Sequence, residues 1–172
     1  MNSFNHVACL VVMGLLCFTM AWPALGEQDS PQITAAEARE IIADGNRQWG
    51  KARVEFDKEM YEKMLAPDFY AQLPDRRLTR QEFIDVIMYE RPGSKLTRFD
   101  ATVLTVQQTA ADEWVALIHE KLEVELPDDM LYSLWITRDG WKKVGDRWVI
   151  TFSEAIGYEN WYGGEKPPFE DW

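Results

Sequence analysis

The chain has 172 residues and a net charge of −11, from 29 acidic and 18 basic side chains. Because such a surface repels phosphate backbones and anionic lipid, we expect neither nucleic acid nor an anionic membrane surface as a partner. After residue 26 there is no cysteine and a single histidine, His119, which excludes structural disulfides, a cysteine nucleophile and the usual Cys/His zinc sites. We therefore expect no metal ion and no cofactor.

The first 26 residues have the pattern of a signal peptide. Residues 1–26 contain no Asp, Glu, Lys or Arg, and the apolar run 7–21 matches a secretory h-region but is short for a membrane-spanning helix. Small residues at Ala24 and Gly26 predict cleavage before Glu27 and a periplasmic or secreted domain. Since no Lys or Arg precedes the apolar run, an uncleaved N-terminal anchor is the alternative. A short linker, 27–33, follows.

Helical patterns occupy the first half of the remaining chain. Capping boxes, in which a Thr is followed three residues later by a Glu, begin at Thr34 and Thr79. After each of them apolar residues recur at steps of three and four, and the first pattern continues over 34–56. Asp57 caps a shorter helix between the two. A short strand, 68–73, connects the second helix to the third.

The second half is rich in β-branched and aromatic residues, which predicts four long strands. The connections between them are short, so neighbouring strands must be antiparallel. Asp139-Gly140 interrupts the third long strand and indicates a bulge that bends the sheet. We expect the tail 158–172, which combines aromatic and acidic residues, to be irregular. The predicted long strands are 96–108, 114–126, 131–144 and 148–156.

Three local motifs accompany this order of elements. They are Met64-Leu65-Ala66-Pro67-Asp68-Phe69, then Pro74-Asp75 followed by Leu78-Thr79-Arg80-Gln81-Glu82-Phe83, and the stretch 141–150. Together they resemble the SnoaL-like and ketosteroid-isomerase-like branch of the nuclear transport factor 2-like superfamily. The resemblance implies a cone-shaped α+β barrel over 34–157, with three N-terminal helices packed in a curved antiparallel sheet. It also implies a conical cavity, which different relatives use as isomerases, cyclases, dehydratases or binders. The branch that this chain resembles most contains exported domains of undetermined function.

Alternation on the strand 114–126 singles out Glu120. The odd positions from 119 to 125 are polar and the even positions 118, 122, 124 and 126 are apolar, so the even face should meet the core, yet Glu120 lies on it. A carboxylate there is unfavourable unless it is paired or lines a cavity, and burial would raise its pKa. Glu120 is therefore the first catalytic candidate, with a salt bridge at the sheet rim or a register slip as the alternatives. His119 is a further candidate, although its polar face favours a surface or interface histidine.

Other candidates come from the neighbouring strands. Glu154 shares an alternation face with Phe152 and other apolar residues of the last strand, so it could approach Glu120 in the cavity. The resemblance implies a catalytic base on the short strand, where Tyr70 and Gln72 share a face with Asp68 but no aspartate matches the base position. Tyr70 could instead donate its hydroxyl to a carbonyl group. The aromatic candidates for lining the pocket, with packing in the core or rim as the alternative, are Trp135 and Tyr89.

Two function hypotheses follow. The first is an exported domain that binds a small, largely apolar organic molecule, with acid–base catalysis through Glu120, Tyr70 or His119 left open. We also expect a homodimer formed through the outer face of the sheet. The second is a non-catalytic module that contacts another envelope protein or a glycan through the sheet face and the tail 158–172.

Overall fold

The computed structural model describes residues 33–89 and 92–163. The predicted signal peptide, residues 1–26, and the last part of the predicted tail, residues 164–172, lie outside the described residues. Within the described ranges, no helix combines the length and the apolar character needed to cross a membrane.

Three helices form where the capping signals predict them. Their bounds are α1 (Ala35–Glu55), α2 (Lys58–Met64) and α3 (Arg80–Ile87). Both capping boxes are present: the Thr34 backbone amide donates to Glu37 over 2.7 Å, and the Thr79 amide donates to Glu82 over 2.8 Å. Asp57 caps α2 by accepting from the Met60 amide. The predicted helices are confirmed.

The cap of α3 gives a stability prediction, because a helix of eight residues has few internal hydrogen bonds to spare. We expect Thr79→Ala to lower the free energy of unfolding by about 1 kcal/mol, measured by urea denaturation. Thr79→Ser keeps the capping hydroxyl and should stay close to the wild type. An equal loss in both variants would mean that the hydroxyl group does not stabilise the helix.

A six-stranded sheet follows the helices along the chain, in the order β2-β1-β6-β5-β4-β3. The four long strands are antiparallel neighbours, as predicted, whereas β1 pairs with β6 in parallel. The parallel pair and the short strand β2 were not predicted. The strands are β1 (Leu65–Gln72), β2 (Arg77–Thr79), β3 (Lys95–Ala110), β4 (Glu113–Glu125), β5 (Met130–Val144) and β6 (Arg147–Tyr162).

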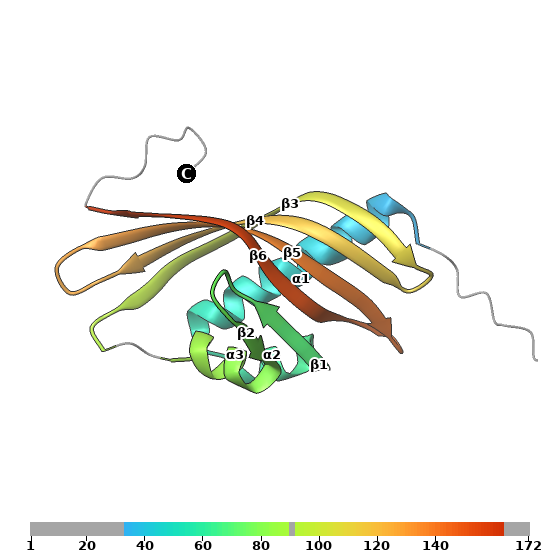
Figure 1. Ribbon diagram of the computed structural model, residues 1–172, viewed down its shortest axis with the longest axis horizontal. Coiled ribbons are helices and arrows are strands. Elements are labelled where there is room, and N and C mark those ends of the chain that lie inside the picture. Colours follow the sequence, from blue (N-terminus) through green and yellow to red (C-terminus); the bar gives the residue numbers. More distant parts are fainter. Residues whose placement is uncertain (1–32, 90–91, 164–172) are drawn as a thin grey trace, which may run out of the picture. The chain divides into compact units, whose positions relative to one another are not determined.

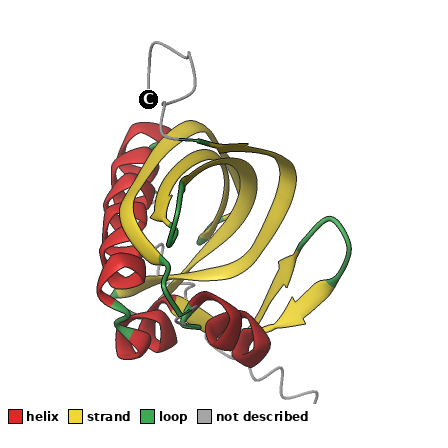
Figure 2. Cartoon of the chain, turned by 90° about the vertical axis from the view of Figure 1, so that its left-hand side faces the viewer, coloured by secondary structure: helices red, strands yellow, loops and turns green. Residues whose placement is uncertain are grey.

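The long strands curl around an interior that α1 flanks along one side (Figures 1 and 2). Part of this bending comes from a bulge: Gly140 pairs with Phe152, but the next residue, Trp141, pairs with Ile150. The extra residue is therefore Thr151. The predicted bulge at Asp139-Gly140 is confirmed in position, although its extra residue lies on the partner strand β6 and not on β5.

The predicted irregular tail begins too early. Strand β6 continues to Tyr162, because β5 starts at Met130 and so offers hydrogen-bond partners as far as the pair Leu131 and Tyr162. Tyr158 stacks on Trp135 with ring centroids 5.0 Å apart. Residues 158–162 are thus part of the sheet and not of an irregular tail.

Aromatic side chains join the three helices to one another beneath the sheet. Trp49 of α1 lies 4.5 Å from Tyr61 of α2 and 5.7 Å from Phe83 of α3, measured between ring centroids. The Tyr61 hydroxyl donates to the Trp49 carbonyl. These contacts hold α3 against α1 and so fix the position of the helices that border the interior.

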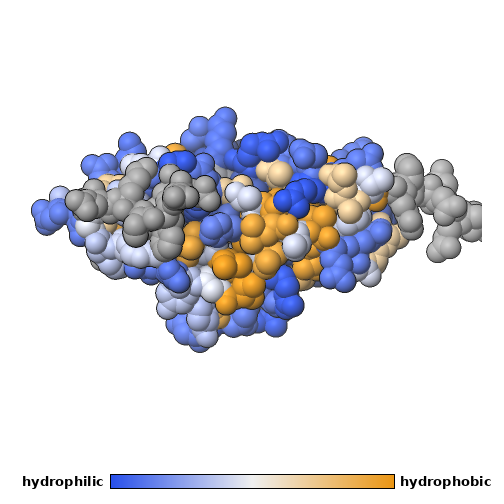
Figure 3. Space-filling view, turned by 90° about the horizontal axis from the view of Figure 1, so that it is seen from above, coloured by the Kyte–Doolittle hydropathy of each residue, from blue (hydrophilic) through white to orange (hydrophobic). Residues whose placement is uncertain are grey.

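Apolar side chains also gather at the surface, over the middle of the long strands (Figure 3). Leu104 on β3 is 40 % exposed, and Leu117 and Ile136 on β4 and β5 are half-buried on the sheet face that points away from the interior. The homodimer that we expect through this outer face stays a prediction.

Candidate functional site

Glu120 lies on the inner face of the sheet, as the alternation of β4 predicts. Its neighbours across the ladder are Ala101 on β3 and Trp135 on β5, and β4 pairs with β5 without a register shift. Only 8 % of Glu120 is exposed. The regular pairing explains why period-two reasoning works on this strand.

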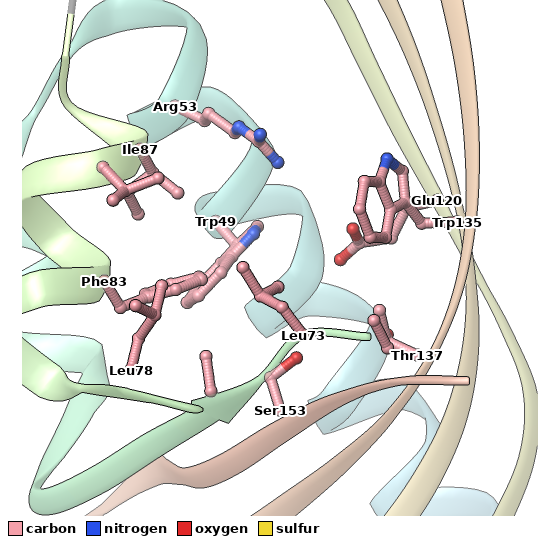
Figure 4. Close-up of a pocket in the computed structure, with 13 residues that line it drawn as sticks. Trp49, Arg53, Leu73, Leu78, Phe83, Ile87, Glu120, Trp135, Thr137 and Ser153 are labelled. Carbon is pink, nitrogen blue, oxygen red and sulfur yellow. The ribbon is translucent and has the colours of Figure 1, made fainter. Parts of the chain in front are cut away.

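The Glu120 carboxylate faces a cavity of about 170 Å³ between the helices and the sheet (Figure 4). Helices α1 and α3 form one wall, the end of β1 forms the floor, and the inner face of β4, β5 and β6 forms the other wall. The lining is mostly aromatic and aliphatic. It consists of Trp49, Arg53, Ala71, Leu73, Leu78, Phe83, Val86, Ile87, Glu120, Trp135, Thr137, Ser153 and Ala155.

Glu120 is an acid with an altered ionisation. Burial raises the pKa of its carboxyl group to about 6, and the positive charge of Arg53 opposes this rise. Glu120 has no hydrogen bond or ion pair with any residue that the structure describes. Its oxygens therefore remain available to a molecule in the cavity.

A second buried acid, Asp139 on β5, was missed by the sequence analysis. Asp139 is 4 % exposed. Burial, and to a smaller extent repulsion from Glu120, raises the pKa of its carboxyl group to about 8, while Ser153 and Thr137 oppose this rise. Two carboxyl groups that repel each other ionise at different pH. Because the pKa of Asp139 is raised further than that of Glu120, Glu120 is the first of the two to lose its proton as the pH rises.

A signal for Asp139 was present in the sequence. It has the same alternation parity on its strand as Trp135 and Trp141, and is therefore an acid on an apolar face, like Glu120. The Asp139-Gly140 pair was instead interpreted only as a bulge. On the inner face, Thr137 of β5 and Ile118 of β4 lie side by side and separate Asp139 from Glu120.

Glu154, Tyr70 and Gln72 lie on the opposite face of the sheet, away from the cavity. Gln72 is the ladder partner of Glu154, and the Tyr70 hydroxyl donates to Glu154 over 3.2 Å. Arg138 forms an ion pair with Glu154, and the guanidinium carbon of Arg77 lies 3.5 Å from the centroid of the Tyr70 ring. This cluster is internally paired, so the predicted approach of Glu154 to Glu120 is wrong, and so is the expectation that Tyr70 and Gln72 face the pocket.

The bulge at Thr151 is the physical reason for the Glu154 error. An extra residue reverses the alternation of the positions after it, here as far as a second register shift at Ile156, so Ser153 and Ala155 face the cavity and Glu154 faces outward. The residues that simple alternation puts on one face of the last strand therefore do not share it. They are Trp148, Ile150, Phe152, Glu154 and Ile156.

The remaining candidates are divided between the cavity and the surface. Trp135 lines the cavity, and its indole N–H donates to Ser133 over 2.8 Å. His119 is half-buried on the outer face of β4, where burial and the nearby Lys121 lower its pKa. Tyr89 is 68 % exposed and is not part of the cavity lining. Of the predicted site residues, Glu120 and Trp135 are brought together.

A larger hollow of about 610 Å³ lies between the start of β1 and strands β4 to β6. Three of its charged side chains are engaged already: Lys142 pairs with Glu113 over 2.7 Å, and Arg80 donates to the backbone carbonyls of Glu62 and Leu65. Among the described residues, no group of three or more His, Cys, Asp or Glu side chains could hold a metal ion. The smaller cavity, with its unpartnered carboxylate, is the better candidate site.

No protein-family model matches the sequence, and no curated protein matches it. Solved structures do. One is a nuclear transport factor 2-like (NTF2-like) protein from Cytophaga hutchinsonii, at 17 % identity and a TM-score of 0.58, with 68 % of this chain and 95 % of that one covered. Another is a candidate scytalone dehydratase from Novosphingobium aromaticivorans, at 12 % identity and a TM-score of 0.58, with 73 % and 89 % covered.

A third similar structure is a hexachlorocyclohexane dehydrochlorinase from Novosphingobium barchaimii, at 10 % identity and a TM-score of 0.59, with 77 % of this chain and 96 % of that one covered. At such low identities, similarity in structure speaks for the fold alone. The chain has the NTF2-like α+β cone fold that its sequence resembles.

Proposed function

We propose that the domain binds a small, largely apolar organic molecule of about one ring in the cavity beside Glu120. The observation that carries this proposal is a buried carboxylate without a partner in a cavity that is otherwise mainly apolar. Such a group costs folding free energy, which is difficult to explain unless its oxygens serve a ligand. The volume of about 170 Å³ supports the size, because a cavity of about 150 Å³ can hold benzene.

The same carboxylate is suited to accept a proton from a bound molecule, because its pKa of about 6 lies close to neutral pH. Elimination reactions, which the names of the dehydrochlorinase and the candidate dehydratase indicate for those proteins, begin in many cases with such a proton transfer. Acid–base catalysis by Glu120 is therefore the reaction type that we propose to test after binding is established.

Glu120→Leu tests the binding proposal, because leucine has a similar volume but cannot accept a hydrogen bond. With phenol as the probe and isothermal titration calorimetry at pH 8 as the measurement, we expect the variant to bind at least about tenfold more weakly. We also expect the variant to be more stable by about 2 kcal/mol at pH 8, since the pKa of Glu120 is about 6 in place of 4.5 and each unit is worth about 1.4 kcal/mol.

Glu125→Gln is the matched control, because Glu125 is an exposed carboxylate on the same strand. It should leave both phenol affinity and stability unchanged. Equal phenol affinity in wild type and Glu120→Leu would contradict the proposal.

A further inference from the structure

Arg53 is a second charged group on the wall of the cavity. It lies in the last turn of α1, is half-buried, and reaches toward the space in front of Glu120 (Figure 4). In the described part of the chain, its guanidinium group has neither a hydrogen bond nor an ion pair. A guanidinium carries five N–H donors in a fixed plane, so a half-buried one without a partner leaves several donors available.

A close contact between α1 and β3 supports Arg53 without using these donors. The guanidinium carbon lies 5.8 Å from the centroid of the Phe99 ring. This ring packs against the bare backbone of Gly50, where an added Cβ would lie 2.3 Å from Phe99 Cδ1. Glycine at position 50 of α1 therefore makes room for the Phe99 ring next to Arg53. A ring contact of this kind does not use the N–H groups of Arg53, which stay available to a ligand.

Arg53 and Glu120 lie on opposite walls of one cavity, and they do not form an ion pair with each other. Arg53 influences Glu120 through the space between them, since its charge lowers the pKa of the acid. Neither charge is bonded to the other or to another described residue. The cavity therefore has hydrogen-bond donors on the Arg53 side and acceptors on the Glu120 side. Trp135, the ladder neighbour of Glu120, is fixed by its bond to Ser133 and provides a flat apolar surface beside Glu120.

We infer that the ligand is a small monocyclic organic acid, whose carboxylate binds Arg53 and whose hydroxyl group donates to Glu120. This inference rests on the proposed function and names the class of molecule that the cavity takes. Guanidinium and carboxylate match in a bidentate geometry, and hydrogen bonds between charged groups are stronger than neutral ones. When the carboxylate and the hydroxyl lie at opposite ends of the ring, the negative charge of the ligand stays away from the negative charge of Glu120.

Three probes of one ring separate the two groups: 4-hydroxybenzoate, benzoate and phenol, each titrated calorimetrically into the folded protein at pH 7. We expect the wild type to bind 4-hydroxybenzoate at least about tenfold more tightly than either single-group probe, because each lacks one charge-assisted contact. Arg53→Met should bind 4-hydroxybenzoate no more tightly than phenol, and its phenol affinity should stay within about twofold of the wild type.

Arg47→Met is the matched control, since Arg47 is an exposed arginine of the same helix that pairs with Asp44 outside the cavity. It should keep the preference for 4-hydroxybenzoate. Arg53→Lys, which keeps the charge but not the planar fork, should retain part of the preference, and it serves if Arg53→Met does not fold.

The outcomes separate the inference from the proposed function. Phenol binding without any gain from the carboxylate, or an undiminished gain in both Arg53 variants, would overturn the inference and leave the proposed function standing. Failure of all three probes to bind would overturn both.

Discussion

Asp139→Asn is expected to remove most of the fall in the free energy of unfolding that the buried acids Asp139 and Glu120 cause between about pH 4 and pH 8. The pKa of Asp139 is about 8 in the folded protein and 3.8 as a free side chain. Each pKa unit corresponds to about 1.4 kcal/mol, so the wild type should lose several kcal/mol of unfolding free energy relative to the variant across this range.

The direction of this effect follows from the protons bound in each state. Between pH 4 and pH 8 the unfolded chain has released the Asp139 proton, whereas the folded chain still holds it. The stabilisation is therefore fully present below pH 4 and is lost as the pH rises through 8. Glu120 adds a smaller loss of the same sign between its ordinary value of 4.5 and about 6.

Urea denaturation of wild type and variant at pH 4, 6 and 8 measures the difference. Asp146→Asn, in the exposed turn between β5 and β6, is the control and should leave the slope unchanged. In a Glu120→Gln background the slope due to Asp139 should shrink, because the repulsion from Glu120 is gone. The same slope in wild type and Asp139→Asn would show that Asp139 ionises normally in the folded protein.

Ile118→Ala should lower the free energy of unfolding by about 2–5 kcal/mol. Ile118 is completely buried and lies on the inner face, between Val103 on β3 and Thr137 on β5. Its removal leaves a cavity between the two buried acids. Water that enters there would hydrate Asp139, whose Oδ1 is buried without a hydrogen bond in the described structure.

Ile118→Ala should consequently also reduce the difference in stability between pH 4 and pH 8, since hydration lowers the pKa of Asp139. Ile118→Val is the graded variant and should cost about 0.5–1.5 kcal/mol. Leu117→Ala, on the same strand but on the half-buried outer face, should cost less than Ile118→Ala. A cost for Ile118→Ala below that of Leu117→Ala would contradict the assignment of the two faces of β4.

Local patterns in the sequence were sufficient for the helices and the long strands. Capping at Thr34, Asp57 and Thr79 depends on residues within one helical turn, so the helix starts are found where they are predicted. The inward orientation of Glu120 was also predictable, because β4 pairs with β5 in unbroken register and alternation holds along its whole length.

The faces of β6 could not be predicted in the same way. One extra residue at Thr151 exchanges the inner and outer positions as far as a second register shift at Ile156. The bulge at Thr151 arises where Gly140 of the neighbouring strand leaves room for the Phe152 ring. Glu154 therefore faces Arg138 and Tyr70, while Ser153 takes its place at the cavity.

By itself, the sequence determined the α+β order of elements, the resemblance to the NTF2-like fold and one acid of the site, because helix caps and strand alternation act between neighbouring residues. Only the tertiary structure decided that Arg53 and Asp139 belong with Glu120. Arg53 comes from a helix, and its place opposite the sheet depends on how Phe99 packs against Gly50. Asp139 acquires its altered pKa only when the curled sheet buries it near Glu120, an effect of distance in space that no spacing along the chain encodes.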